Sequence, residues 1–114
     1  MSHTPQADIS SLFKKLPPKD HAASQSLVNK VFAESIYVKW MLDALEKSGC
    51  PFPKERVKCE ECPMMGAYDW VTKEILICGN HVRTEKDLIN VLTHEMVHAF
   101  DDCRAKVVII YYFY

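Results

Sequence analysis

The sequence predicts an α+β fold, and three features of its 114 residues lead to this prediction. Apolar residues recur at spacings of three and four between Gln25 and Ser48, which is typical of amphipathic helices. Two short runs with strand propensity, Ala67 to Val71 and Ile75 to Cys78, flank a polar turn and indicate a short antiparallel sheet edge. A last apolar pattern, preceded by a capping threonine, indicates a helix from Thr84 to about Lys106.

The composition is that of one small globular domain. Hydrophobic residues make up 48% of the chain, charged residues make up 25%, and the net charge is −1. This balance gives no electrostatic reason to expect a nucleic-acid partner. No stretch approaches the roughly 20 apolar residues that cross a bilayer. The first 20 residues also lack an apolar signal core and an Arg-rich presequence.

The N-terminal region is polar and interrupted by prolines. We predict a flexible arm over residues 1–24, with a short helical turn near Ile9 to Lys15, and one domain over residues 25–114. In that domain one or two amphipathic helices end at Gly49. Trp40 and Met41 on these helices form a packing surface or, in the alternative interpretation, line a peptide groove.

The helix predicted after Thr84 carries the stretch HEMVH, from His94 to His98. On a helix the two histidines lie one turn apart on the same face, so both imidazoles can reach one Zn²⁺ ion. Glu95 lies about 100° around the helix axis and points toward the water that such an ion would bind. These residue types at this spacing are those of a zinc peptidase, with Glu95 as the general base. A surface helix with two exposed histidines is the alternative.

Two histidines do not complete a catalytic zinc site, which usually has three protein ligands and one open position. Asp101 and Asp102 follow on the same helix, but Asp102 lies about 12 Å along the axis from His94, too far to share one ion with it. His81, in the loop after the second strand, is either a ligand that folds back or an ordinary loop histidine. The sequence therefore does not identify the third ligand.

Five cysteines are many for a chain of this length, and the odd count leaves at least one thiol without a partner inside the chain. Three interpretations stay open. The cysteines form disulfides that tie loop, sheet and helix together, or a four-sulfur zinc site, or a redox pair within the stretch CEEC. We adopt disulfides, although the spacing does not give the pairing. A redox pair is disfavoured because no thioredoxin-like strand–helix pattern surrounds CEEC. The residues are Cys50, Cys59, Cys62, Cys78 and Cys103.

Four stretches together resemble one family, the mitochondrial inner-membrane metalloproteases that process the precursor of an ATP synthase membrane subunit and assist assembly of that complex. A human member is also called a Ku-binding protein. The resemblance runs from about Tyr37 to Val107, and its most specific block runs from His94 to Arg104. The stretches are YVKWMLDALEKSGC, CEEC, GAYDWVTKEILICGN and THEMVHAFDDCRAKV.

The resemblance implies a zincin-like metalloprotease core with His94 and His98 as zinc ligands and Glu95 as the catalytic base. It also implies that the five cysteines are oxidised in the intermembrane space, and that the protein associates peripherally with the inner membrane. Family chains continue past the position of Val107 and supply a downstream acidic ligand, whereas this chain ends in VVIIYYFY. We predict that run to be a buried strand or a junction to foreign or out-of-frame sequence, and the C-terminal half of the core to be missing.

We therefore predict a zinc-dependent endopeptidase of the mitochondrial intermembrane space, peripheral to the inner membrane. Its protein substrate, by resemblance, is the precursor of an ATP synthase membrane subunit. The alternative is a non-catalytic assembly or interaction protein, or an inactive truncated isoform with an incomplete zinc site. In that alternative the helices around Trp40 bind a client.

Overall fold

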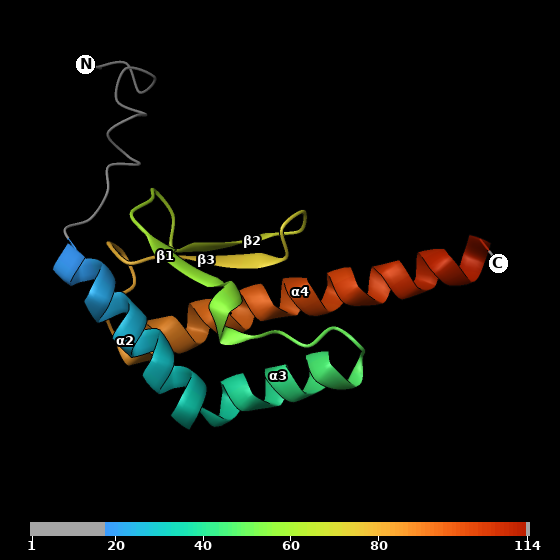
Figure 1. The fold of residues 1–114 in the computed structure, drawn as a ribbon, viewed down its shortest axis with the longest axis horizontal. Helices are drawn as coiled ribbons and strands as arrows, with labels where there is room; N and C mark the ends of the chain where they lie inside the picture. The colour runs from blue at the N-terminus through green and yellow to red at the C-terminus, as the bar shows by residue number, and fades with distance from the viewer. Residues whose placement is uncertain (1–17, 114) are drawn as a thin grey trace, which may run out of the picture.

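The computed structural model describes residues 18–113, and the side chains of residues 22–105. The helical turn predicted over Ile9 to Lys15 lies outside them. A long helix runs through the molecule with a small sheet against one side of it (Figure 1). Of two shorter helices, the second runs along the long helix and the first crosses its start and also contacts the first strand. The α+β class predicted from the sequence is confirmed. The elements are α2 Pro18–Glu34, α3 Ile36–Lys47, the 3₁₀ turn η1 Lys54–Arg56, β1 Val57–Glu60, β2 Gly66–Asp69, β3 Glu74–Cys78 and α4 Glu85–Phe113.

The first helical region is two helices, because Ser35 interrupts it. The Ser35 backbone N–H donates to Val31 O at 2.9 Å and closes the last turn of α2. The Ser35 side chain accepts a hydrogen bond from the backbone N–H of Val38 at 3.3 Å and caps α3. α2 begins at Pro18 rather than at Gln25, so residues 18–24, which the sequence assigns to an arm, are helical.

Gly49 ends α3, as predicted, and directs the chain toward α4. Its φ of +86° is a conformation that glycine adopts without steric cost. The next residue, Cys50, donates its N–H to Leu45 O at 2.9 Å. Cys50 is bonded to Cys103, so the end of α3 is joined covalently to the middle of α4.

The strand pair is confirmed, and it is part of a mixed sheet rather than a purely antiparallel one. β2 and β3 pair antiparallel, while β1 pairs with β3 in parallel, in the order β1-β3-β2. β1 was not predicted from the sequence. Its four residues, VKCE, alternate apolar and polar side chains, but the run is short and lies in a stretch rich in cysteine, lysine and proline. A parallel partner also becomes adjacent only through a long connection, which local pattern does not reveal.

The turn between β2 and β3 is held by Asp69. Its carboxylate accepts hydrogen bonds from the backbone N–H groups of Val71 and Thr72, at 2.8 and 3.2 Å. These two bonds lower the pKa of Asp69 below its ordinary value. Lys73 completes the turn with a φ of +65°.

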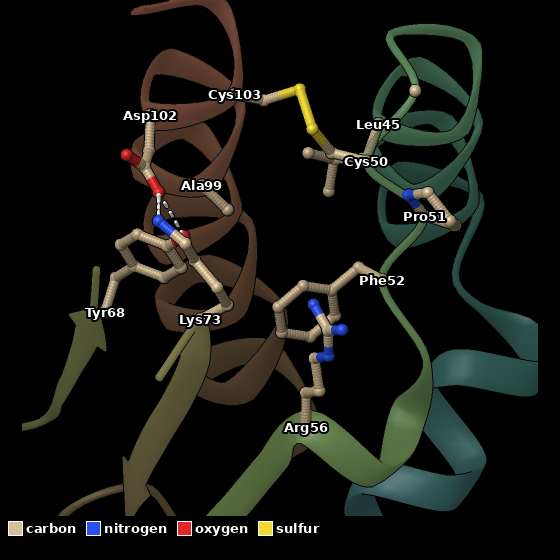
Figure 2. A pocket seen from close by; sticks show the side chains of 11 residues that line it. Leu45, Cys50, Pro51, Phe52, Arg56, Tyr68, Lys73, Ala99, Asp102 and Cys103 are labelled. Carbon is tan, nitrogen blue, oxygen red and sulfur yellow. Dashed lines mark hydrogen bonds and ion pairs between the residues drawn. A yellow bond between two sulfur atoms is a disulfide. The ribbon is translucent and has the colours of Figure 1, made fainter. Parts of the chain in front are cut away.

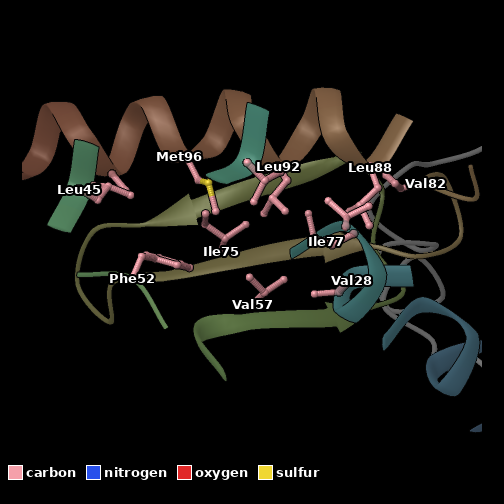
Figure 3. Close-up of a cluster of buried hydrophobic side chains, with 13 residues drawn as sticks. Val28, Leu45, Phe52, Val57, Ile75, Ile77, Val82, Leu88, Leu92 and Met96 are labelled. Atoms are coloured by element: carbon pink, nitrogen blue, oxygen red, sulfur yellow. The ribbon is translucent and has the colours of Figure 1, made fainter. Parts of the chain in front are cut away.

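The core lies between the sheet and α4, and α2 and α3 close it (Figure 3). The sequence predicts an apolar stripe at Leu88, Leu92, Met96, Ala99 and Cys103, and all five side chains are buried. This stripe fixes the rotation of α4 about its axis, and therefore decides which of its residues face outward. The other large buried side chains are Val28, Val31, Val38, Leu45, Phe52, Val57, Ile75, Ile77 and Val82.

Four of the five cysteines form disulfides, Cys50–Cys103 and Cys62–Cys78, which confirms that interpretation for these residues. Cys59 has a free thiol, so neither the four-sulfur zinc site nor the pairing of Cys59 with Cys62 is formed. Burial raises the pKa of the Cys59 thiol to about 11. At neutral pH this thiol is protonated and a poor nucleophile.

The prediction of a buried strand after Lys106 is wrong, because α4 continues to Phe113. A helix that is already formed extends at one hydrogen bond per residue, and β-branched and aromatic residues disfavour it by well under about 1 kcal/mol each. The propensity of VVIIYYF for strand is therefore too small to end the helix. In the part of the chain that the structure describes, no helix combines the length and apolarity of a membrane span.

Candidate metal centre

His94 and His98 lie side by side on the exposed face of α4. Their ring centroids are 5.0 Å apart and the ring planes meet at 83°. Two imidazoles that bind one tetrahedral zinc ion through Zn–N bonds of about 2.0–2.1 Å have centroids roughly 5 Å apart. The spacing of the two rings therefore fits a shared ion.

Glu95 lies on the side of α4 that faces the sheet and is only 8% exposed. It lines an open cleft of about 440 Å³ between α4 and the start of β2. His94 lines the same cleft, so the carboxylate and one imidazole face a common space. The other lining residues are Met65, Gly66, Asp87, Asn90 and Val91.

Gly66 allows β2 to lie directly against α4 at this cleft. A Cβ at this position would stand 2.6 Å from Val91 Cγ1, 2.9 Å from the backbone oxygen of Leu76 and 3.8 Å from Glu95 Cγ. The first two distances are too short for any side chain. A larger residue would separate the strand from the helix that carries Glu95.

We expect the substitution Gly66→Ala to lower the free energy of unfolding by about 1–3 kcal/mol through overpacking. In the double variant Gly66→Ala/Val91→Ala the loss should be smaller than the sum of the two single losses, because the valine methyl is gone while the Leu76 oxygen stays. Urea unfolding of the four proteins gives this coupling. Full additivity would show that the strand and the helix do not meet at Gly66.

Asp102 anchors the β2–β3 hairpin to α4. Its carboxylate accepts a hydrogen bond from the Tyr68 hydroxyl at 2.8 Å and pairs with the Lys73 amine at 2.7 Å (Figure 2). Burial, and then the bond to Asp102, raises the pKa of Tyr68 well above its usual value, so the hydroxyl is a hydrogen-bond donor. Asp102 therefore acts as a structural residue of the helix, in line with its exclusion from the ligand set.

In the part of the chain that the structure describes, no third ligand accompanies the two histidines. Within the described residues, no group of three or more His, Cys, Asp or Glu side chains is placed to hold a metal ion. His81 is an exposed residue of the turn after β3, and its backbone N–H donates to Cys78 O at 2.9 Å. The possibility that His81 folds back as a ligand is therefore not realised in this structure.

Two features of the site were not predicted from the sequence. Gly66 stands at the beginning of β2, and the only signal for it was a glycine just before a strand, which marks a close approach of backbone to another element. No sequence pattern indicated that Tyr68 and Lys73 contact Asp102, because Asp102 lies 34 positions after Tyr68 and 29 positions after Lys73.

Comparison with known proteins decides the family. The model of the peptidase M76 family matches residues 22–110, which include every element from β1 to β3 and the HEMVH stretch. This chain belongs to the peptidase M76 family.

Relatives of this M76 chain carry one name in several animals. The mitochondrial inner membrane protease ATP23 homolog of Xenopus laevis is 45% identical over 76 residues, which are 64% of this chain and 32% of the relative. The human homolog is 41% identical over 81 residues, 68% of this chain and 33% of the relative. The mouse homolog is 36% identical over 105 residues, 90% of this chain and 50% of the relative. The chain thus spans a third to a half of their length, and no solved structure matches it.

Proposed function

We propose that this M76 chain carries the catalytic half of a zincin-like site and acts in zinc-dependent cleavage of peptide bonds. The observation that carries the proposal is the arrangement of three side chains on α4. The ring centroids of His94 and His98 are 5.0 Å apart on the exposed face, a spacing that fits a shared ion. Glu95 faces the adjoining cleft.

His94 and His98 would hold the ion as two of its protein ligands. Zinc in such a site lowers the pKa of a coordinated water to about 7 and polarises a carbonyl group. Glu95 is placed to accept a proton from the attacking water and to deliver it to the amine that leaves. Its position supports this role, because Glu95 is only 8% exposed and faces the same cleft as His94.

β2 would position the substrate. It is an edge strand of the described sheet, so its outer backbone groups can pair with an added strand. Gly66, at the start of β2, lies beside Glu95 in the same cleft. A polypeptide extended along this edge would pass over the face of α4 that carries the histidines.

The substrate and the compartment follow from the relatives and the resemblance. The relatives are named mitochondrial inner membrane proteases, and we propose the intermembrane side of that membrane for this chain. Its two disulfides fit an oxidising compartment. By resemblance, the substrate is the precursor of an ATP synthase membrane subunit, and the third zinc ligand is an acidic residue that family chains supply beyond the position of Val107.

A second candidate is a non-catalytic assembly or interaction protein. It is favoured by the lack of a third metal ligand among the described residues. In this case the cleft binds a polypeptide without cutting it, and zinc has no effect on the bound chain.

The experiment that separates the two uses reduced, carboxymethylated casein as an unfolded substrate. We expect cleavage in excess Zn²⁺, its loss in 1,10-phenanthroline, and its return when zinc is added back. The excess is needed because two protein ligands alone hold the ion weakly. Binding of casein without any cleavage in zinc would support the second candidate, and cleavage that the chelator leaves unchanged would reject a metal mechanism.

A further inference from the structure

A second groove lies between α3 and the first turns of α4. It has a volume of about 770 Å³. Tyr37, Trp40 and Met41 line it from α3, and Ile89, Asn90 and Thr93 line it from α4. The Cys50–Cys103 and Cys62–Cys78 disulfides and the Asp102 contacts are not part of it.

The aromatic wall of this groove is unusually open. Trp40 is 60% exposed and Tyr37 is 59% exposed, while their rings pack edge to face with centroids 5.7 Å apart. The two rings therefore support each other and present a firm apolar surface to solvent. Large exposed apolar surfaces with firm aromatic anchors are typical of binding sites.

The groove adjoins the candidate metal centre. Asn90 lines both the groove and the cleft that contains His94 and Glu95. On a helix, Asn90 and His94 are one turn apart, about 6 Å along the axis. A polypeptide bound over the histidines would therefore lie within a few residues of the groove.

The charged side chains around the groove indicate what kind of molecule can bind in it. The groove carries one acidic and one basic side chain, Glu85 and Lys86, and Glu85 is paired with Lys30 at 3.0 Å. This rim offers no cluster of positive charge for an anionic membrane surface. The remaining lining is aromatic, aliphatic or neutral, which suits an uncharged apolar side chain.

We propose that this groove is a specificity subsite, which takes an aromatic or long aliphatic side chain of the polypeptide that lies across His94 and His98. The inference rests on the proposed peptidase function and adds a substrate preference to it. An extended chain advances about 3.3 Å per residue, so the preferred side chain should stand about two to four residues from the bond that is cut. Trp40 would be the main determinant.

The test compares Trp40→Ser with Trp70→Ser. Trp70 is the other tryptophan of the chain, it is 69% exposed at the β2–β3 turn, and it lines neither the groove nor the cleft. Mass spectrometry of casein fragments identifies the bonds that are cut. For the wild type and for Trp70→Ser, we expect apolar residues to be enriched at one position about two to four residues from the cut bond. In Trp40→Ser the enrichment should vanish. The ratio of kcat/KM for a leucine-containing peptide to kcat/KM for the same peptide with serine in that place should fall roughly tenfold.

A binding measurement makes the inference independent of catalysis. In the variant Trp70→Phe/Glu95→Gln, Trp40 is the one tryptophan and cleavage should be slowed about 10²–10⁴-fold. The leucine peptide should shift its fluorescence to the blue in a saturable way, and the serine peptide should not. This result supports the subsite even if the wild type cuts nothing, in which case only the proposed function fails.

Three results would overturn the subsite. The first is cleavage whose sequence preference is unchanged in Trp40→Ser. The second is a shift of Trp40 fluorescence that depends on protein concentration and not on peptide, together with a dimer in sedimentation. The groove would then be an interface between two copies of the chain. The third is a response to cardiolipin–phosphatidylcholine vesicles without a response to the leucine peptide.

Discussion

Replacement of Glu95 by glutamine is expected to lower kcat for casein cleavage by about 10²–10⁴-fold, which is the usual contribution of a positioned general base. Glutamine keeps the size of the side chain, and the buried position beside β2 should accept it. The glutamine amide cannot, however, accept a proton from the attacking water. The fold, the two histidines and the substrate groove should be unchanged.

The matched control for this variant is Asp101→Asn. Asp101 is an exposed carboxylate on the same helix and lines neither the cleft nor the groove. Its loss should change kcat less than about twofold, since exposed charges contribute little. Equal effects of the two substitutions, or full activity of Glu95→Gln, would remove Glu95 from the mechanism.

Loss of the disulfide between Cys50 and Cys103 should destabilise the protein more than any other single crosslink. The two residues are separated by 53 positions. The entropy of closing a loop of this length in the unfolded chain corresponds to about 4 kcal/mol, against about 3 kcal/mol for the 16 positions between Cys62 and Cys78. We expect Cys50→Ser/Cys103→Ser to lower the free energy of unfolding by roughly this larger amount, as measured in urea.

Cys59→Ser provides the control for the disulfide variants. Cys59 has a free, half-buried thiol, so its substitution should cost less than about 1 kcal/mol. An unfolding free energy of Cys50→Ser/Cys103→Ser equal to that of Cys59→Ser would show that the end of α3 is not covalently joined to α4. Scrambled pairing with Cys59, seen in a non-reducing digest, would contradict the assigned pairs directly.

Patterns within one element could be predicted from the sequence. The apolar stripe from Leu88 to Cys103 gave the buried face of α4, and Thr84 gave its start, where its hydroxyl accepts the N–H of Asp87 at 3.0 Å. Once that face is buried, geometry alone places His94 and His98 outward together. The spacing of the two rings follows from a local rule.

Features that depend on two distant segments could not be predicted. β1 is defined by a parallel partner whose paired residues lie 18 positions later, with Val57 opposite Ile75. The need for a glycine at position 66 depends on Val91, which belongs to another element. Local propensity favours a strand after Lys106, which was one of the two interpretations of that run, but the helix that precedes it continues to Phe113. In the first two cases a tertiary neighbour outweighed the local signal, and in the third the helix already formed did so.

The central claim is that His94 and His98 hold one ion together. Imidazole NMR of the five histidines during a Zn²⁺ titration tests it most directly. The account predicts that the His94 and His98 signals move with one common midpoint, that His81 does not respond, and that His98→Ala shifts the His94 midpoint by at least about tenfold. Separate midpoints for the two rings, or a His94 response unchanged in His98→Ala, would contradict it.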